Sequence, residues 1–173
     1  MTDLHFSDEQ APLTDRVDSI PVILPEHIRH VFSKSTCLFS KSEVDAALDR
    51  MSTEISYQLG NQNPIFLCVV VGGIVALGNM LPRLDFPLEV DYIHATRYRN
   101  TTQGHELVWK ARPNTPLKGR TVVVVDDILD GGITLDGIVK YCQEQKAESI
   151  YTAVLVEKEG TRLPEGLPHV DFC

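Results

Sequence analysis

The sequence predicts an α/β domain with a mainly parallel, twisted sheet that helices flank, together with one extended, flexible hairpin. Two segments, 64–71 and 121–125, are too uniformly apolar for strands with one wet face, and such strands are typical of parallel sheets. They alternate with segments of helical periodicity, as in α/β folds. A third segment, 89–111, alternates polar and apolar residues on both sides of "TTQGH", which indicates two paired strands.

Composition limits the classes of protein to which the chain can belong. Its 173 residues are 43% hydrophobic and 23% charged, which is ordinary for a globular protein. We expect an N-terminal arm over residues 1–24 and a single domain over residues 25–173. The formal net charge of −8 argues against nucleic acid or an anionic membrane as a partner, because both need clustered Lys and Arg. Four widely spaced cysteines and the lack of a signal pattern or a membrane-length apolar run favour a cytoplasmic protein with reduced thiols.

The first half of the domain is predicted to contain a helix, a strand and a second helix. Ser40 and Glu43 have capping-box spacing at the start of the segment 40–59, and apolar residues then recur on one helical face. The buried strand at 64–71 follows. It leads into a short helix that Pro82 ends, since proline cannot continue a helix without losing a hydrogen bond.

The second half repeats this order after the hairpin at 89–111. The valine-rich strand that begins at residue 121 is followed by a helical pattern over 134–147 and by a final buried strand over 149–158. Ligands in such sheets bind beyond the carboxyl ends of the strands. The sequence therefore directs attention to "VVVGG" and "VVVVDDILDGG", where two buried strands end.

The stretch "TVVVVDDILDGGITL", residues 121–135, holds a glycine pair immediately before a predicted helix. A glycine loop at this position exposes backbone N–H groups beside the positive end of the helix dipole, which suits a phosphate group. Gly131 and Gly132 leave room for the anion, and Thr134 adds a hydroxyl. The pattern is neither GxxxxGK[ST] nor GxGxxG. Taken alone, it is also compatible with a simple strand-to-helix turn.

The same stretch places two adjacent carboxylates, Asp126 and Asp127, at the end of the valine run. Adjacent carboxylates repel each other unless hydrogen-bond donors or a cation lie nearby. Sugar hydroxyls and Mg²⁺ supply such partners, and Mg²⁺ at phosphate sites is commonly held by one or two carboxylates. The sequence therefore predicts a ribose 5-phosphate site with Mg²⁺ as its cofactor. The alternative is a solvated acidic pair at a strand end.

The pattern "VVVVDDILDGGITL" resembles the signature with which type I phosphoribosyltransferases bind 5-phosphoribosyl 1-pyrophosphate (PRPP). The resemblance covers residues 64–158, where "LCVVVGG", "LEVDYIHATRY" and "VLVEK" correspond to the other active-site loops of hypoxanthine-guanine phosphoribosyltransferases, bacterial ones in particular. It implies a purine salvage enzyme that joins hypoxanthine or guanine to PRPP and gives IMP or GMP and pyrophosphate. It also implies Mg²⁺ as cofactor and a homodimer or homotetramer.

The resemblance implies roles for the residues of this stretch. Asp126 and Asp127 would hold the ribose hydroxyls of PRPP, directly or through Mg²⁺. Asp130 would be the general acid/base near N7 of the purine. The cradle of the 5′-phosphate would consist of Asp130, Gly131, Gly132, Ile133 and Thr134.

Three further segments have counterparts in the family. Val71 and Gly72 match the loop that contacts pyrophosphate, where the family often has a non-proline cis peptide bond. Arg97 and Tyr98 match the dipeptide of the mobile loop that closes over the reacting atoms. Lys158 matches the lysine that contacts the exocyclic oxygen of the purine and so selects 6-oxopurines.

The sequence also departs from the family pattern. Gly131 stands where many relatives have Thr or Glu, and Val71 replaces a residue that is polar or charged in some relatives. The family normally continues past the position of Cys173, so we expect the C-terminal hood over the purine to be missing. Three alternatives stay open: a phosphoribosyltransferase for xanthine or a pyrimidine, a non-catalytic regulator that binds PRPP or a nucleotide, and a plain α/β interaction module.

Overall fold

The computed structural model describes residues 25–97, 107–158 and 170–173. The chain divides into two compact units, residues 1–43 and residues 44–173, each of which is described by itself. The expected N-terminal arm falls outside the described residues and stays a prediction. None of the helices in the described ranges combines the length and the apolar character that crossing a membrane requires.

The first unit contains α2 (Glu26–Ser33), which buries none of its residues. It also contains the start of α3 (Lys41–Leu59), where the predicted capping box is present. The Ser40 N–H donates to Oε2 of Glu43 at 2.6 Å, and the Glu43 N–H donates to Oγ of Ser40 at 3.3 Å. The pair thereby occupies backbone N–H groups that the first turn of a helix leaves without partners.

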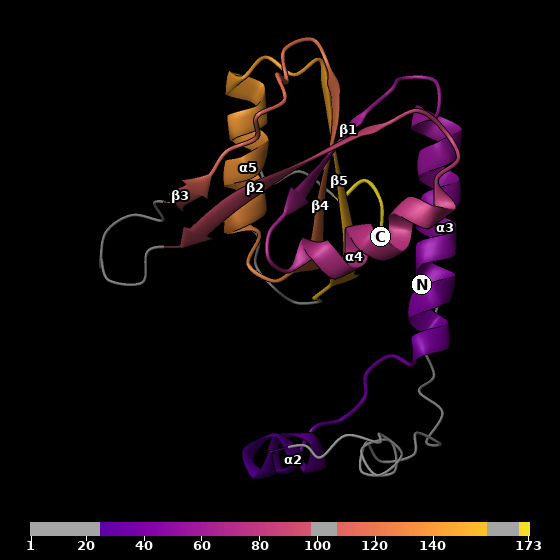
Figure 1. Cartoon of the computed structure of the whole chain (residues 1–173), viewed down its shortest axis with the longest axis vertical. Coiled ribbons are helices and arrows are strands. Elements are labelled where there is room, and N and C mark those ends of the chain that lie inside the picture. Colours follow the sequence, from indigo (N-terminus) through magenta and orange to yellow (C-terminus); the bar gives the residue numbers. More distant parts are fainter. Residues whose placement is uncertain (1–24, 98–106, 159–169) are drawn as a thin grey trace. The chain divides into compact units, whose positions relative to one another are not determined.

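Beyond α3, strands and helices alternate as the sequence predicts. In chain order they are β1 (Ile65–Val69), α4 (Gly73–Met80), the 3₁₀ turn η1 (Leu81–Arg83), β2 (Glu89–Arg97), β3 (Leu107–Ala111), β4 (Thr121–Leu129), α5 (Ile133–Glu144) and β5 (Ser149–Glu157). The strands form one sheet in the order β3-β2-β1-β4-β5, shown in Figure 1. The β1–β2, β1–β4 and β4–β5 pairs are parallel, and β2 and β3 form the predicted antiparallel hairpin.

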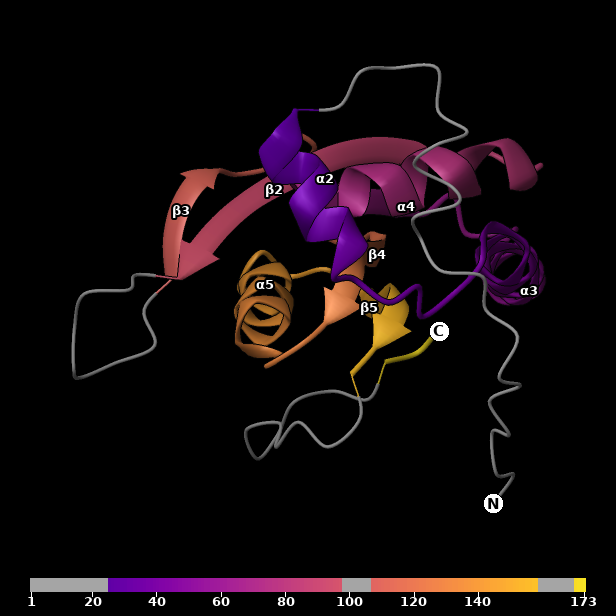
Figure 2. The same ribbon diagram turned by 90° about the horizontal axis from the view of Figure 1, so that it is seen from below.

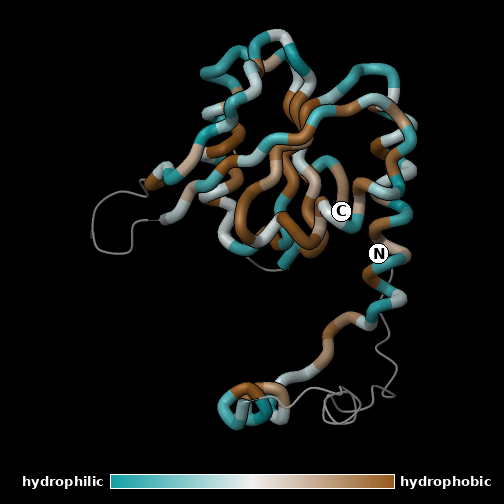
Figure 3. The backbone as a smooth tube through the Cα atoms, viewed as in Figure 1, coloured by the Kyte–Doolittle hydropathy of each residue, from teal (hydrophilic) through white to brown (hydrophobic). Residues whose placement is uncertain are grey.

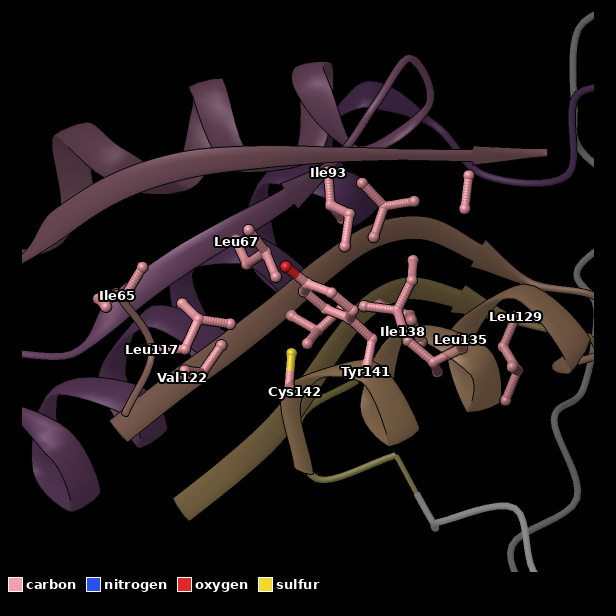
Figure 4. Close-up of a cluster of buried hydrophobic side chains, with 14 residues drawn as sticks. Ile65, Leu67, Ile93, Leu117, Val122, Leu129, Leu135, Ile138, Tyr141 and Cys142 are labelled. Carbon is pink, nitrogen blue, oxygen red and sulfur yellow. The ribbon is translucent and has the colours of Figure 1, made fainter. Parts of the chain in front are cut away.

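Helices cover both faces of this sheet, so alternate side chains of the central strands enter two different core clusters. Ile65 and Leu67 of β1 pack on the α5 side, in the cluster drawn in Figure 4. Phe66 and Cys68 pack on the other side, with residues of α3 and α4. Figure 3 shows the resulting apolar character along the central strands, and Figure 2 shows α5 and α4 on their separate sides. This double burial explains why the strands read as continuous apolar runs.

The segment 170–173 pairs with the outer edge of β5. The Phe172 N–H donates to the Thr152 carbonyl at 3.0 Å, and the Val154 N–H donates to the Phe172 carbonyl at 3.0 Å. The Phe172 side chain is only 1% exposed and packs in the α3/α4 cluster. The carboxylate of Asp171 accepts hydrogen bonds from the N–H and the hydroxyl of Thr152. These contacts cover part of a strand edge that would otherwise present unpaired backbone groups.

Candidate active site

The acidic pair lies within a strand, which corrects one expectation. The sequence suggested that the strand ends where the valines end, but β4 continues to Leu129 and its backbone stays paired with β5 as far as Glu157. Asp126 and Asp127 are therefore held by the sheet on the last residues of β4. Side-chain alternation directs the Asp127 side chain to the α4 side of the sheet, because Val125 packs on that side.

The loop between β1 and α4 lies directly against this pair. A Cβ atom added to Gly72 would lie 2.6 Å from Oδ1 of Asp127, and one added to Gly73 would lie 2.5 Å from the carbonyl oxygen of Val125. At Gly73 the neighbour is backbone, so only glycine permits the approach, whereas at Gly72 the neighbour is the end of an exposed side chain. The Val70–Val71 peptide bond is cis. The loop expected to contact pyrophosphate therefore contains a non-proline cis peptide bond. This bond precedes Val71, whereas the next one, between Val71 and Gly72, is not cis.

The two carboxylates have unequal surroundings. Asp126 is partly buried and Asp127 is exposed. Oδ1 of Asp126 accepts a hydrogen bond from the Asp127 N–H at 2.9 Å, and Oδ1 of Asp127 accepts one from the Ile128 N–H at 2.8 Å. Burial raises the pKa of Asp126 to about 7, and the neighbouring carboxylate of Asp127 also raises it. Negative charge is therefore disfavoured at Asp126 until a cation or hydroxyl donors arrive.

The carboxylates of Asp126 and Asp127 suit a Mg²⁺ ion that is also coordinated by a substrate and by water. Within the described ranges, no group of three or more His, Cys, Asp or Glu side chains could hold a metal ion. Two adjacent carboxylates fit Mg²⁺ whose remaining oxygen ligands come from phosphates and water. Asp126 and Asp127 are the residues that would hold such an ion, directly or through the hydroxyls of a sugar.

The turn from β4 into α5 has the properties expected of an anion site. Gly132 adopts the left-handed conformation, with φ of 65°, immediately before Ile133 begins the helix. No side chain caps α5. Its first N–H groups therefore stay available to a ligand, beside the positive end of the helix dipole. Thr134 and Gly132 both line the cavity described below.

Lys158 and Asp130 lie side by side at the ends of neighbouring strands. Nζ of Lys158 is 2.9 Å from Oδ1 of Asp130, and the Lys158 N–H donates to the Leu129 carbonyl at 3.1 Å. The parallel pairing of β4 with β5 brings together two residues that are 28 positions apart in the sequence. Both side chains are more than half exposed, which leaves them accessible to a ligand.

A cavity of about 240 Å³ joins these features. Of the residues predicted for the site, it is lined by Gly72, Asp126, Asp127, Asp130, Gly132 and Thr134. Lys158 does not line the cavity but contacts the lining residue Asp130. Val71, Gly131 and Ile133 adjoin lining residues without lining the cavity themselves. Arg97 ends β2, where its backbone pairs with Leu107, and Tyr98 lies outside the described residues.

The apolar part of the cavity lining was not predicted from the sequence. Val69 at the end of β1, Val70 directly after it and Ala95 of β2 contribute to it. Ile128 also lines the cavity and is 45% exposed, although it sits on a strand between Asp127 and Leu129. The sequence held one signal for the exposure of Ile128. Carboxylates lie on both sides of it at the end of a strand, where no hydrophobic core is expected. Its exposed side chain gives the cavity an apolar surface next to Asp130.

Comparison with known proteins gives concordant matches. The family model described as "Phosphoribosyl transferase domain" matches residues 38–168. The hypoxanthine-guanine-xanthine phosphoribosyltransferase of Tritrichomonas foetus is 28% identical over 136 residues, which cover 79% of this chain and 74% of that protein. The hypoxanthine-guanine phosphoribosyltransferase of Bacillus subtilis (strain 168) is 26% identical over 127 residues, which cover 72% and 70%. A solved hypoxanthine-guanine-xanthine phosphoribosyltransferase superposes with a TM-score of 0.72 at 26% identity, covering 80% of this chain and 79% of that one.

Proposed function

The chain belongs to the phosphoribosyltransferase family, and from this premise we propose that it is a purine salvage enzyme that joins a 6-oxopurine to PRPP. The products are the purine nucleotide, IMP from hypoxanthine or GMP from guanine, and pyrophosphate. The observation that carries the proposal is the convergence of an acidic pair, an uncapped helix start and the Asp130–Lys158 pair on one cavity. Each of these features suits a different part of the two substrates.

The 5′-phosphate of PRPP would bind at the start of α5. The left-handed backbone at Gly132 opens this turn, and the N–H groups of the first helical turn can donate to phosphate oxygens. The Thr134 hydroxyl adds a donor at the same place. The ribose would then lie over the end of β4, where the carboxylates of Asp126 and Asp127 accept hydrogen bonds from its hydroxyls.

Departure of pyrophosphate from C1 builds positive charge on the ribose ring. The Asp126 and Asp127 carboxylates, fixed by the sheet and by their backbone hydrogen bonds, would stabilise this charge without having to reorganise. When bound, Mg²⁺ would supply charge neutralisation for the pyrophosphate. The loop at Gly72, in contact with Asp127, lies on the side to which the leaving group would depart.

The base would bind beside Asp130 and Lys158. N9 of the purine forms the bond to C1 while the bond from C1 to the pyrophosphate oxygen breaks, and the Asp130 carboxylate takes the proton from N7. The Lys158 ammonium, 2.9 Å from Asp130, donates to the exocyclic oxygen at C6 of the purine. Ile128 supplies an apolar surface for the purine ring. A 6-aminopurine would place a donor against the Lys158 ammonium and bind poorly.

Xanthine is a second candidate base, because the relative from Tritrichomonas foetus is named for hypoxanthine, guanine and xanthine. The test is to incubate the protein with PRPP, Mg²⁺ and each of hypoxanthine, guanine, xanthine, adenine and uracil, and to measure nucleotide and pyrophosphate. We expect turnover with hypoxanthine or guanine and little with adenine or uracil. If no base is turned over, the proposal that the protein is an enzyme is refuted, and the alternative of a non-catalytic PRPP-binding regulator remains. The cytoplasmic location and the homodimer or homotetramer stay predictions.

A further inference from the structure

Gly137 lies inside α5, where it lets the helix approach the hairpin closely. Glycine inside a helix is less favourable than alanine, so its presence there calls for a reason. A Cβ atom added to Gly137 would overlap Cδ1 of Leu107 and would lie 3.3 Å from its Cγ. Leu107 is the first residue of β3 and is partly buried. The Leu107 side chain therefore occupies the space that any larger residue at position 137 would need.

A second contact lies one turn further along α5. The rings of Trp109 and Tyr141 are 5.2 Å apart between centroids and tilted by 41°. The Arg112 guanidinium lies 5.6 Å from the Trp109 ring and 5.5 Å from the Tyr141 ring. The two contacts are two residues apart on β3, a rise of about 6.6 Å, and four residues apart on α5, a rise of about 6 Å, so they match in spacing. They fix β3 along α5, beside which Figure 1 shows it.

The hairpin and α5 both line the cavity. Ala95 of β2 lines it and pairs in register with a residue of β3. Thr134 and Leu135, in the first turn of α5, line it as well. Thr134 precedes Gly137 by three residues, less than one helical turn, so a movement of the helix at Gly137 also moves Thr134. The contact with the hairpin therefore bears on where the start of α5 lies relative to the β2 side of the cavity.

We propose that Gly137 and Leu107 are positioning residues, whose contact sets the distance between the start of α5 and the β2 side of the cavity. This inference rests on the proposed function, in which the start of α5 binds the 5′-phosphate of PRPP and neither residue touches the substrate. Overlapping carbon atoms must separate toward a contact distance of about 3.5–4.0 Å, so a methyl group at position 137 forces a displacement of about 1 Å or more. A phosphate displaced by about 1 Å misplaces C1 of the ribose over Asp126 and Asp127, which can cost about 100-fold in rate.

The first test is calorimetric titration of Gly137→Ala with PRPP and Mg²⁺. We expect its Kd to rise by about tenfold or more, because the methyl group displaces the Leu107 side chain or the start of α5. The melting temperature should stay close to that of the wild type, since the helix propensity of alanine offsets the lost contact. The matched control is Gly78→Ala in α4, where an added Cβ atom would meet nothing within 4 Å. It should keep the wild-type Kd and raise the melting temperature by about 2–4 °C.

Leu107→Ala tests whether the contact is the cause, because it removes both atoms that a Cβ atom at position 137 would meet. Alone, it should raise the Kd for PRPP by about tenfold, since the start of α5 loses its contact with the hairpin. In that background, Gly137→Ala should change the Kd by less than about twofold and raise the melting temperature by about 2–4 °C. A contact that only supports folding would change the melting temperature and leave the Kd unaltered.

An unchanged Kd in Gly137→Ala or in Leu107→Ala would overturn the proposal and show that the buried core alone places α5. Losses that add in the double variant would also overturn it, since two residues of one contact do not act independently. Failure of the proposed function is distinguishable from both results. A wild type that binds PRPP without turning over any base refutes the enzyme and leaves this proposal to the Kd values, whereas a wild type that does not bind PRPP overturns both.

Discussion

Nζ of Lys158 lies 2.9 Å from Oδ1 of Asp130, so the ends of β5 and β4 are linked beside the cavity. The two side chains are 61% and 53% exposed, and an ion pair in such an environment contributes little to folding, at most about 1 kcal/mol. Its value is therefore chemical. In the proposed function, the pair holds a cation and a carboxylate where each would contact a different atom of one planar base.

Lys158→Gln should separate catalysis from stability. We expect kcat/KM for hypoxanthine to fall by about 10- to 100-fold, the effect of losing a hydrogen bond from a charged donor. Discrimination against adenine should fall too, because a neutral amide accepts a 6-amino group as readily as it donates to a 6-oxo group. The melting temperature should stay close to that of the wild type. Lys158→Arg, which keeps the charge, should retain more activity; an equal loss in both variants would argue against a role for the charge.

Asp130→Asn should lower turnover much more than PRPP binding. The amide cannot accept the N7 proton, and loss of a general base costs about 10²- to 10⁴-fold. Calorimetric titration with PRPP and Mg²⁺ should give a Kd within a few-fold of the wild type. Asp136→Asn is the matched control, since Asp136 lies in the first turn of α5, the helix that follows Asp130, and pairs with Lys140 at 2.7 Å. If turnover and binding fall equally in Asp130→Asn, Asp130 is a binding residue and not the base.

The sequence allowed the element order and half of the residues that line the cavity to be predicted, because both depend on local patterns. Uniformly apolar strands identified a sheet buried on both faces, and the Ser40–Glu43 spacing identified the start of α3. The predicted end of β4 was wrong. Apolar periodicity stops at Val125, but backbone pairing with β5 continues, and pairing depends on a neighbouring strand that local sequence does not specify.

Contacts between distant residues could not be predicted from local patterns. The close approach of Gly72 to Asp127 depends on where α4 packs against β4, and the sequence shows only a glycine after a strand. Pairing of residues 170–173 with β5 was missed for the same reason, since the segment is too short to have a recognisable pattern. Ile128 is exposed because β4 ends at the cavity, which local sequence does not show.

Asp126→Asn should raise the stability of the ligand-free protein above neutral pH. Folding raises the pKa of Asp126 from 3.8 to about 7, chiefly by burial, so between these values the folded state holds a proton that the unfolded state has lost. Stability from this group is therefore present at low pH and is lost as pH rises through that window. We expect the unfolding free energy of Asp126→Asn to exceed that of the wild type by near zero at about pH 4 and by about 1–2 kcal/mol at about pH 8. This gain is smaller than the full pKa shift would give, because the Asp126 side chain is partly solvated.

The measurement is urea denaturation of both proteins across this range, which cancels the titration of all other groups. Addition of Mg²⁺ with PRPP should stabilise the wild type at high pH by mass action and should stabilise Asp126→Asn less. A stability difference between Asp126→Asn and wild type that does not change with pH would show that Asp126 titrates as an ordinary solvated carboxyl.

Gly72→Ala should damage PRPP binding with little effect on folding. The added methyl group would lie 2.6 to 2.7 Å from the three terminal atoms of the Asp127 side chain, and an exposed side chain relieves such a collision by rotating away. The substitution therefore displaces the Asp127 carboxylate and leaves the hydrophobic core unchanged. We expect Mg²⁺-dependent PRPP affinity to drop by about tenfold or more, and the unfolding free energy to change by less than about 1 kcal/mol. A double-mutant cycle with Asp127→Ala tests this cause. If the methyl group acts by displacing Asp127, the double variant binds PRPP as weakly as Asp127→Ala alone; losses that simply add would show that Gly72 contributes through its own backbone and not through Asp127.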